Sequence, residues 1–465
     1  MVFNSLQFLV FFLVVTLWFF KLKNQKNRIL LLLVASCYFY MSFIPVYVLI
    51  LGGTIIIDFF AGIQIEKNEG NARKTWLILS LIANIGTLAV FKYYNFFLDN
   101  LHSGLLVFNK QVDLPFLKMA LPIGLSFHTF QAMSYTIEVY RKKQVAERNF
   151  IIYALYVMFY PQLVAGPIER PQNILPQLHQ FRPINYDNIK EGISRMCWGF
   201  FKKSVIADRL AMVVDYTHLH ISTSSSLTLC IGAILYSFQI YCDFSGYSDI
   251  AIGAAKVMNI QLMENFNQPY LSKNISSFWA NWHISLSGWF RDYLYIPLGG
   301  NRKGNLRRKI NVFIVFILSG LWHGANRTFL LWGFLHGVLV VFMPHKENTN
   351  NKPIQKFILN TFMILINFSL VSVLWIFFRS ENIHHAFQYI LKMVSFSSGT
   401  NYTGIDKIEL LFSFMLILLL LLREKLLPKH DIKKNSLFYL FTISIIVICY
   451  YFGVFAENQF IYFQF

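Results

Sequence analysis

The chain has 465 residues, of which 55% are hydrophobic, 17% aromatic and only 14% charged. Ordinary soluble domains are about 25% charged, so the composition excludes a soluble catalytic module and predicts an all-α polytopic membrane protein. The net charge of +18 is compatible with nucleic-acid binding. However, the basic residues lie between apolar runs and form no aromatic-interleaved platform, so we expect the lipid bilayer and no nucleic acid as a partner.

Apolar runs that could cross a bilayer as helices follow one another along the whole sequence. Residues 91–109 are a looser aromatic stretch, and residues 263–309 are amphipathic and mostly too polar to span. The pattern predicts about ten to twelve spans in one integral domain. The candidate helices are residues 6–20, 29–46, 47–65, 75–92, 114–140, 150–165, 191–213, 228–240, 243–260, 310–321, 329–342, 357–378, 410–422 and 437–455.

The basic loops predict the orientation of the chain. Loops rich in Lys and Arg stay on the cytoplasmic side of a membrane, so both termini are expected on the opposite, extracytoplasmic side. The basic loops are residues 21–28, 73–74, 141–148, 302–309 and 423–434.

One apolar segment cannot be a regular helix. Residues 160–178, YPQLVAGPIERPQNILPQL, contain four prolines and one glycine, and proline inside a helix removes a hydrogen bond and clashes with the preceding turn. Non-helical backbone at membrane depth is tolerated where it packs in protein or lines a wet cavity. We therefore predict a re-entrant or interfacial element, with a plain extramembrane loop as the alternative.

A histidine between two spans is a candidate for chemistry. His323 lies in the segment SGLWHGANRTFLLWGFL, between Trp322 and Gly324. A neutral imidazole can take a proton from a hydroxyl near pH 7, and the glycine could leave space for a substrate beside the ring. The alternative is a packed, hydrogen-bonded core histidine.

The segment 278–300, FWANWHISLSGWFRDYLYIPLGG, holds a second histidine. Read as one helix, it carries an aromatic stripe beside a polar stripe with a spacing of four residues. The alternative is an interfacial helix with a tryptophan belt. The aromatic stripe is Trp279, Trp282, Leu286 and Trp289, and the polar stripe is His283, Ser287 and Arg291.

Further polar residues occur in apolar surroundings. Asp243 and Asp249 should pair with Arg or with a backbone donor, because unpaired carboxylates are costly there; a proton relay is the alternative. His128 lies in a predicted span. No GxSxG, HExxH or GxxxxGK[ST] motif occurs, and we expect no metal site.

Several long motifs, taken together, resemble one family. LVAGPIERPQNILPQL, YCDFSGYSDIAIGAAKVM, FNQPYLSKNISSFWANWHISLSGWFRDYLYIPLGG, LSGLWHGANRTFLLWGFLHG and the terminal FIYFQF are similar to the membrane-bound O-acyltransferase (MBOAT) family. The similarity is to its bacterial branch of alginate and peptidoglycan O-acetyltransferase membrane subunits and the teichoic acid D-alanyl transfer protein. By this resemblance, N-terminal helices (1–113) and C-terminal helices (344–465) flank a catalytic core (114–343).

The resemblance implies a helical bundle around a central funnel in the bacterial inner membrane. His323 corresponds to the essential family histidine, and His283 to the second histidine across the same tunnel. No cofactor is expected to be bound; acetyl-coenzyme A or another acyl thioester would be the co-substrate, and an extracytoplasmic glycan the acceptor, with a periplasmic SGNH-type partner. Candidates for the tunnel are Trp322, Asn326, Ser287, Trp282, Arg291, Asp243 and His128.

Some chemistry stays open at this stage. The oxyanion donor could be His283, which we prefer, or Ser287 or Asn326, and an acyl-enzyme is an alternative route. The GPIERPQNILPQL and FIYFQF motifs favour acetyl as the acyl group. The alternatives are D-alanyl transfer from a carrier protein to teichoic acid, and a non-enzymatic polysaccharide transporter.

Overall fold

The structure, a computed structural model, describes residues 1–108, 112, 115–117, 121–343, 353–426, 435–455 and 460–461. This part of the chain is helical and contains no β-strand. It divides into two compact units, residues 1–196 with 250–263, and residues 197–249 with 264–465. The positions 114 and 344, where the predicted core and C-terminal region begin, lie outside the described residues, and so do most of the basic loop 423–434 and of the FIYFQF motif.

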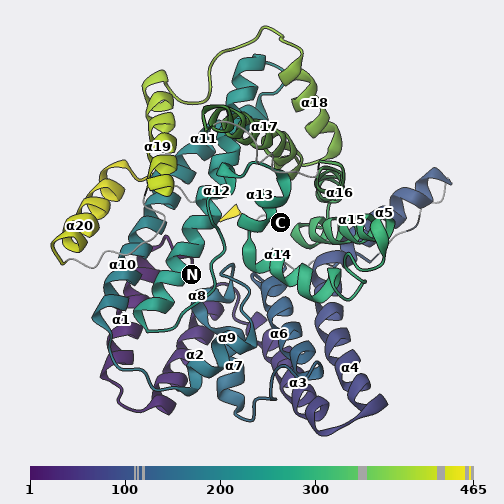
Figure 1. Cartoon of the computed structure of the whole chain (residues 1–465), viewed down its shortest axis with the longest axis vertical. Helices are drawn as coiled ribbons and strands as arrows, with labels where there is room; N and C mark the ends of the chain where they lie inside the picture. Colours follow the sequence, from purple (N-terminus) through teal and green to yellow (C-terminus); the bar gives the residue numbers. More distant parts are fainter. Residues whose placement is uncertain are drawn as a thin grey trace. The chain divides into compact units, whose positions relative to one another are not determined.

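The first unit is built mainly from the N-terminal helices (Figure 1). A π-helical turn, Ala89–Tyr93, joins two of them into one apolar helix, Gly70–Val107, so the looser stretch that we predicted from residue 91 is wrong. The helices are α1 (Leu6–Lys21), α2 (Gln25–Met41), α3 (Tyr47–Lys67), α4 (Gly70–Leu88), α5 (Tyr94–Val107), α6 (Leu125–Tyr140), α7 (Phe150–Met158), α8 (Tyr160–Leu163) and α9 (Pro171–His179).

Two long helices contain the boundary between the units. One is α10 (Tyr186–Phe200), which continues through a π-helix, Phe201–Ala207, into α11 (Asp208–Leu219); the other is α12 (Ser226–Val257). The two apolar runs predicted within 228–260 therefore form one helix.

The remaining helices belong to the second unit. One of them, α18, is missing from the prediction because its twelve residues are too few to span a bilayer. The helices are α13 (Ile275–Asn281), α14 (Ile284–Phe290), α15 (Gly304–His323), α16 (Arg327–Phe342), α17 (Pro353–Arg379), α18 (Ile383–Val394), α19 (Lys407–Leu426) and α20 (Asn435–Phe452).

Membrane character is visible in the helices themselves. Five helices of the described part are long and apolar enough to span a bilayer, and two shorter ones, Leu6–Lys21 and Arg327–Phe342, are also apolar. The total of ten to twelve spans stays a prediction. The five are Tyr47–Lys67, Gly70–Val107, Ser226–Val257, Ile354–Arg379 and Asn435–Phe452.

The proline-rich segment is interrupted as predicted. Helix α8 is a single turn, residues 164–170 are irregular, and α9 begins at Pro171. Residues 159–169 are buried, so this segment is packed in protein and is not a plain exposed loop.

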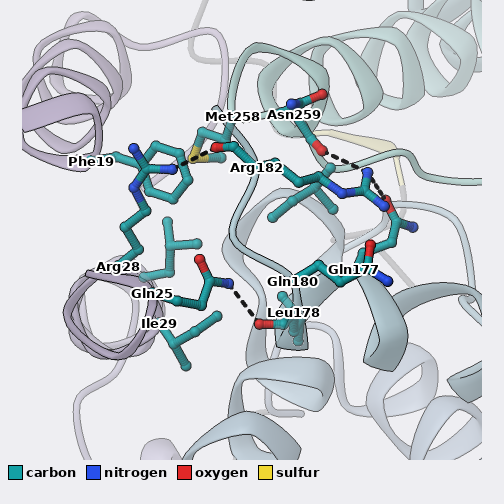
Figure 2. Close-up of a pocket in the computed structure, with 12 residues that line it drawn as sticks. Phe19, Gln25, Arg28, Ile29, Gln177, Leu178, Gln180, Arg182, Met258 and Asn259 are labelled. Carbon is teal, nitrogen blue, oxygen red and sulfur yellow. Dashed lines mark hydrogen bonds between the residues drawn. The ribbon is translucent and has the colours of Figure 1, made fainter. Parts of the chain in front are cut away.

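Figure 2 shows how one predicted basic loop is held in the first unit. Arg28 is only 4% exposed. Its guanidinium donates to the carbonyl oxygens of Leu22 (2.9 Å) and Arg182 (2.7 Å), and its Cζ lies 4.7 Å from the ring centroid of Phe19. These contacts compensate for the lost hydration of the charge, so Arg28 acts as a packing residue.

Candidate active site

A break between two short helices presents the first motif histidine. Helix α13 ends at Asn281, α14 begins at Ile284, and His283 between them has φ 46° and ψ 54°. The prediction of one continuous helix through this segment is therefore wrong. A left-handed backbone costs a residue with a Cβ roughly 1–2 kcal/mol, and surrounding contacts must hold it: the Ile284 N–H donates to Asn265 O at 2.9 Å.

The break also separates the predicted polar stripe. Ser287 donates to Trp282 O at 3.3 Å, so its hydroxyl is engaged within the turn. Arg291 lies on the exposed side, where its Nε donates to Asp292 at 2.8 Å and its side chain is 67% exposed. The structure therefore does not bring Arg291 together with His283.

The second motif histidine is placed by a helical hairpin. His323 is the last residue of α15, which packs along α16 (Figure 1). The two helices approach at glycines: a Cβ on Gly320 would collide with Phe329 O, and one on Gly333 with Phe316 O. Small residues allow membrane helices to pack this closely, and His323 is thereby brought against Trp332.

Gly324, the residue after His323, does not leave the open space that we expected beside the imidazole ring. A Cβ on Gly324 would collide with the ring of Phe329. The space beside Gly324 is therefore filled by a side chain of α16, and the expectation that it admits a substrate is wrong.

Both motif histidines belong to one buried aromatic cluster, defined by His283, Trp322, His323, Trp332 and Phe378. The His283 ring centroid is 6.1 Å from that of Trp322, and Trp322 is 5.0 Å from His323. His323 meets Trp332 and Phe378 edge-on, each at 5.2 Å. His283 is 1% exposed and His323 3%. The structure therefore brings the two motif histidines into one cluster, and the tunnel implied by the family resemblance stays a prediction.

A third histidine, His336, extends this cluster and was not predicted from the sequence. His336 is fully buried, and its Nδ1 accepts from Trp279 Nε1 at 3.3 Å. Its ring lies 4.9 Å from Trp332, which stacks on Trp375 at 5.5 Å. The available signal was a histidine in the middle of an apolar run, since such a residue is a functional candidate by default.

The predicted carboxylates are paired, but with lysine. Lys203 Nζ lies 2.7 Å from Asp243 and 2.8 Å from Asp208. The second oxygen of Asp243 accepts the backbone N–H of Ile461 at 2.8 Å. The predicted backbone donor is confirmed for Asp243, whereas its cation is Lys203 and not the predicted Arg.

Lys202, which precedes Lys203 in the sequence, pairs with the second predicted carboxylate, Asp249. Lys202 lies 2.5 Å from Asp249 and is 4% exposed. Lys202 and Lys203 were missed, although two lysines inside a predicted apolar helix require counter-ions. They stand in a π-helix, a feature frequent at functional sites.

Two other predicted residues are engaged elsewhere. Asn326 caps α16 by accepting from Thr328 N at 3.0 Å, and it donates to Glu381 O at 2.8 Å. His128 belongs to the first unit, where its Nε2 lies 2.7 Å from Thr54 Oγ1. Tunnel roles for both stay predictions.

The protonation state of His283 follows from its surroundings. It lies outside the candidate spans, and burial lowers its pKa to about 3, because a charged imidazolium would be poorly solvated. His283 is therefore neutral at physiological pH. Among the described residues, no three His, Cys, Asp or Glu side chains come together as metal ligands.

The chain is similar to known proteins over most of its length. The model of the MBOAT, membrane-bound O-acyltransferase family matches residues 141–380, which include both motif histidines. The chain is 38% identical over 435 residues to the probable alginate O-acetylase AlgI of Pseudomonas aeruginosa, covering 91% of this chain and 82% of that protein. It is 37% identical over 405 residues to the peptidoglycan O-acetyltransferase of Helicobacter pylori, covering 80% and 75%.

A more distant relative is the teichoic acid D-alanyltransferase of Bacillus subtilis, 29% identical over 277 residues, with 57% of this chain and 70% of that protein covered. The extent of the first two similarities and the family match make the protein a membrane O-acyltransferase and exclude the transporter alternative. The chain belongs to the MBOAT family.

Proposed function

We propose that this O-acyltransferase passes an acetyl group from a cytoplasmic acyl thioester, such as acetyl-coenzyme A, towards hydroxyls of an extracytoplasmic polysaccharide. The observation that carries this proposal is the contact of both His283 and His323 with Trp322 inside one buried cluster. No bound cofactor takes part; the thioester is a co-substrate.

His323 is the general base of the proposed reaction. Its imidazole takes the proton of the acceptor hydroxyl while the hydroxyl oxygen attacks the thioester carbonyl carbon. The carbon–sulfur bond then breaks, the thiolate leaves, and the imidazolium returns the proton to it, so that an ester and a free thiol result. A positioned base contributes about 10²–10⁴-fold to such a step.

His283 supplies a hydrogen bond to the developing oxyanion. A neutral imidazole keeps one N–H donor, and the low pKa of about 3 keeps His283 neutral. A fixed donor in a site shielded from water stabilises developing charge more than it would in water. Of the other oxyanion candidates, Ser287 and Asn326 already donate to carbonyl oxygens, which favours His283.

The acceptor and the acyl group are proposed from the relatives. Two relatives that align with at least 80% of this chain are named for O-acetylation of alginate or peptidoglycan. The D-alanyltransferase aligns with 57% at lower identity. An acetyl group and a polysaccharide acceptor are therefore favoured, and D-alanyl transfer from a carrier protein to teichoic acid is the alternative.

The proposed location is the bacterial inner membrane, with both termini outside the cytoplasm. Support comes from the basic loops, of which 302–309 directly precedes or begins α15. A periplasmic SGNH-type protein would complete transfer to the polymer.

The test is glycan O-acetylation in cells that lack the native gene and carry wild type, His323→Ala or His283→Ala. His384→Ala is the matched control, because His384 is an exposed histidine of α18. Wild type and the control should restore acetyl esters, and His323→Ala at normal membrane abundance should not. Full acetylation with His323→Ala would refute the catalytic assignment.

A further inference from the structure

A small pocket of the first unit lies where α1 ends and α2 begins (Figure 2). Its volume is about 20 Å³, enough for one water-sized group and far below the roughly 300–1,000 Å³ of sites that enclose a whole small molecule. The pocket can therefore take one oxygen atom of a ligand whose remainder stays outside. The polar lining residues are Gln25, Arg28, Gln177, Gln180, Arg182 and Asn259, and no acidic residue is among those described around the pocket.

The two arginines of this pocket keep free hydrogen-bond donors. Arg28 donates to Leu22 O and Arg182 O. Arg182 donates to Gln177 Oε1 and Asn259 O, both at 3.1 Å. Each guanidinium thus uses two of its five N–H groups. None of the described polar atoms that are fully enclosed without a partner belongs to Arg28 or Arg182, so the free N–H groups can be reached from outside.

The positive charge at the pocket is only partly balanced. Neither arginine forms an ion pair with a described residue, and two of their acceptors are carbonyl oxygens at the C-terminal ends of α1 and α12. A helix C-terminus carries about half a negative elementary charge, so the two ends offset about one of the two guanidinium charges. No Asp or Glu occurs in residues 1–57 or 171–186, whereas Lys21, Lys23 and Lys26 are exposed in the loop and at the start of α2. The pocket therefore favours an anion.

The end of α1 has the features of a membrane–water interface. The helix is apolar, and its last turns expose Leu17 (53%) and Trp18 (57%). Tryptophan is enriched at the level of the lipid headgroups, and the Lys21 ammonium lies 5.9 Å from the Trp18 ring centroid. Arg28 stands in the first turn of α2, after a short link, and its Cζ lies 4.3 Å from the ring centroid of Phe181. The guanidinium is thus held in place beside the headgroup region.

We propose that this pocket binds the phosphate group of an anionic phospholipid. A phosphate oxygen enters the pocket and accepts N–H groups of Arg28 and Arg182, while the acyl chains lie along the exposed apolar side chains of α1. Arginine suits this contact because its N–H groups match the geometry of phosphate oxygens. Inorganic phosphate and the phosphates of coenzyme A share this anionic chemistry, but neither carries acyl chains that could lie on the apolar surface of α1.

The experiment is native mass spectrometry of the purified full-length chain in detergent. The probes are dioleoyl phosphatidylglycerol and dioleoylglycerol, which has the same acyl chains without the phosphate. Wild type should retain one phosphatidylglycerol at least about tenfold more tightly than dioleoylglycerol, as expected for a charge-assisted contact. Arg28→Gln with Arg182→Gln should abolish most of this preference. Lys21→Gln with Lys23→Gln removes the same charge at exposed lysines and should preserve it.

A second variant covers loss of folding in the double arginine variant. Arg182→Gln alone leaves the contacts of Arg28 in place, because these use backbone carbonyl oxygens, and it should still weaken phosphatidylglycerol binding. Equal retention of the two lipids, or an equal loss in the arginine and lysine double variants, would overturn the proposal. Displacement of the lipid by millimolar inorganic phosphate or coenzyme A would show a site for those anions instead. His323→Ala should retain the lipid like wild type, so the outcome is independent of the proposed acyl transfer.

Discussion

The imidazole of His323 meets the indole of Trp332 edge-on, with ring centroids 5.2 Å apart and ring planes at 89°. Trp332 is fully buried and stacks on Trp375, so His323 rests against a rigid aromatic wall. A base held by packing needs little reorganisation when the substrates arrive. The position of His323 thus depends on the close approach of α15 and α16.

Replacing His323 by Gln should lower kcat for acetyl transfer by about 10²–10⁴-fold, the usual contribution of a general base, with KM changed much less. Gln keeps a polar side chain of similar reach but cannot accept the proton. Initial rates with the purified protein and its periplasmic partner would measure the effect, with His384→Gln as the control. A loss below tenfold would argue against a general base at this position.

Gly320→Ala should impair activity although Gly320 has no reactive side chain, because its Cβ would collide with the Phe329 carbonyl. The helices must separate, and overpacking typically costs about 1–3 kcal/mol. Gly86→Ala in α4 is the matched control, since no atom lies within 4 Å of its added Cβ. Thermal unfolding and transfer rates should both decline for Gly320→Ala only. If the two variants have the same unfolding temperature and the same transfer rate, the close approach of α15 and α16 at Gly320 does not position His323.

His283→Ala should lower kcat by about 10²–10³-fold, as for loss of one oxyanion donor. Because burial lowers the pKa of His283 to about 3, the residue gains a proton only as the pH falls towards that value. Between pH 5 and 8, the profile of kcat/KM for the variant should therefore keep the wild-type shape at a lower level. If kcat/KM of the wild type falls at low pH and that of the variant does not, His283 is instead the group that gains a proton in this range.

Lys203→Met should destabilise the protein by about 3–5 kcal/mol, because it leaves Asp243 and Asp208 buried without their cation. Lys407→Met makes the same change at an exposed lysine and should have little effect. The melting temperature in detergent would show the difference. Similar melting of both variants would mean that the two carboxylates do not depend on Lys203.

The position of His323 could be predicted because it depends on local sequence. The apolar run of α15 ends at the polar segment that follows His323, and the helix indeed ends there. The break at His283 could not be predicted, since the tryptophan spacing around it fits a continuous helix. The break depends on contacts made from elsewhere in the chain, including Ser285 Oγ donating to Asn265 Oδ1 at 2.6 Å.

The partners in long-range ion pairs likewise could not be predicted from the sequence. The sequence shows that Asp243 needs a partner, but Lys203 is 40 positions earlier and only the packing of α12 against the Phe201–Ala207 π-helix identifies it. The use of Gly324 was misjudged for the same reason, because the Phe329 ring that fills its space comes from the next helix.

The proposed function requires that acetyl crosses the membrane only when His323 is present. The most direct measurement uses proteoliposomes that enclose acetyl-coenzyme A with a labelled acetyl group and have a short glycan acceptor and the periplasmic partner outside. Label should appear in the outer glycan with wild type and not above background with His323→Ala. Equal labelling by the two proteins, or labelling only when the thioester is supplied on the outside, would contradict transfer across the membrane by His323.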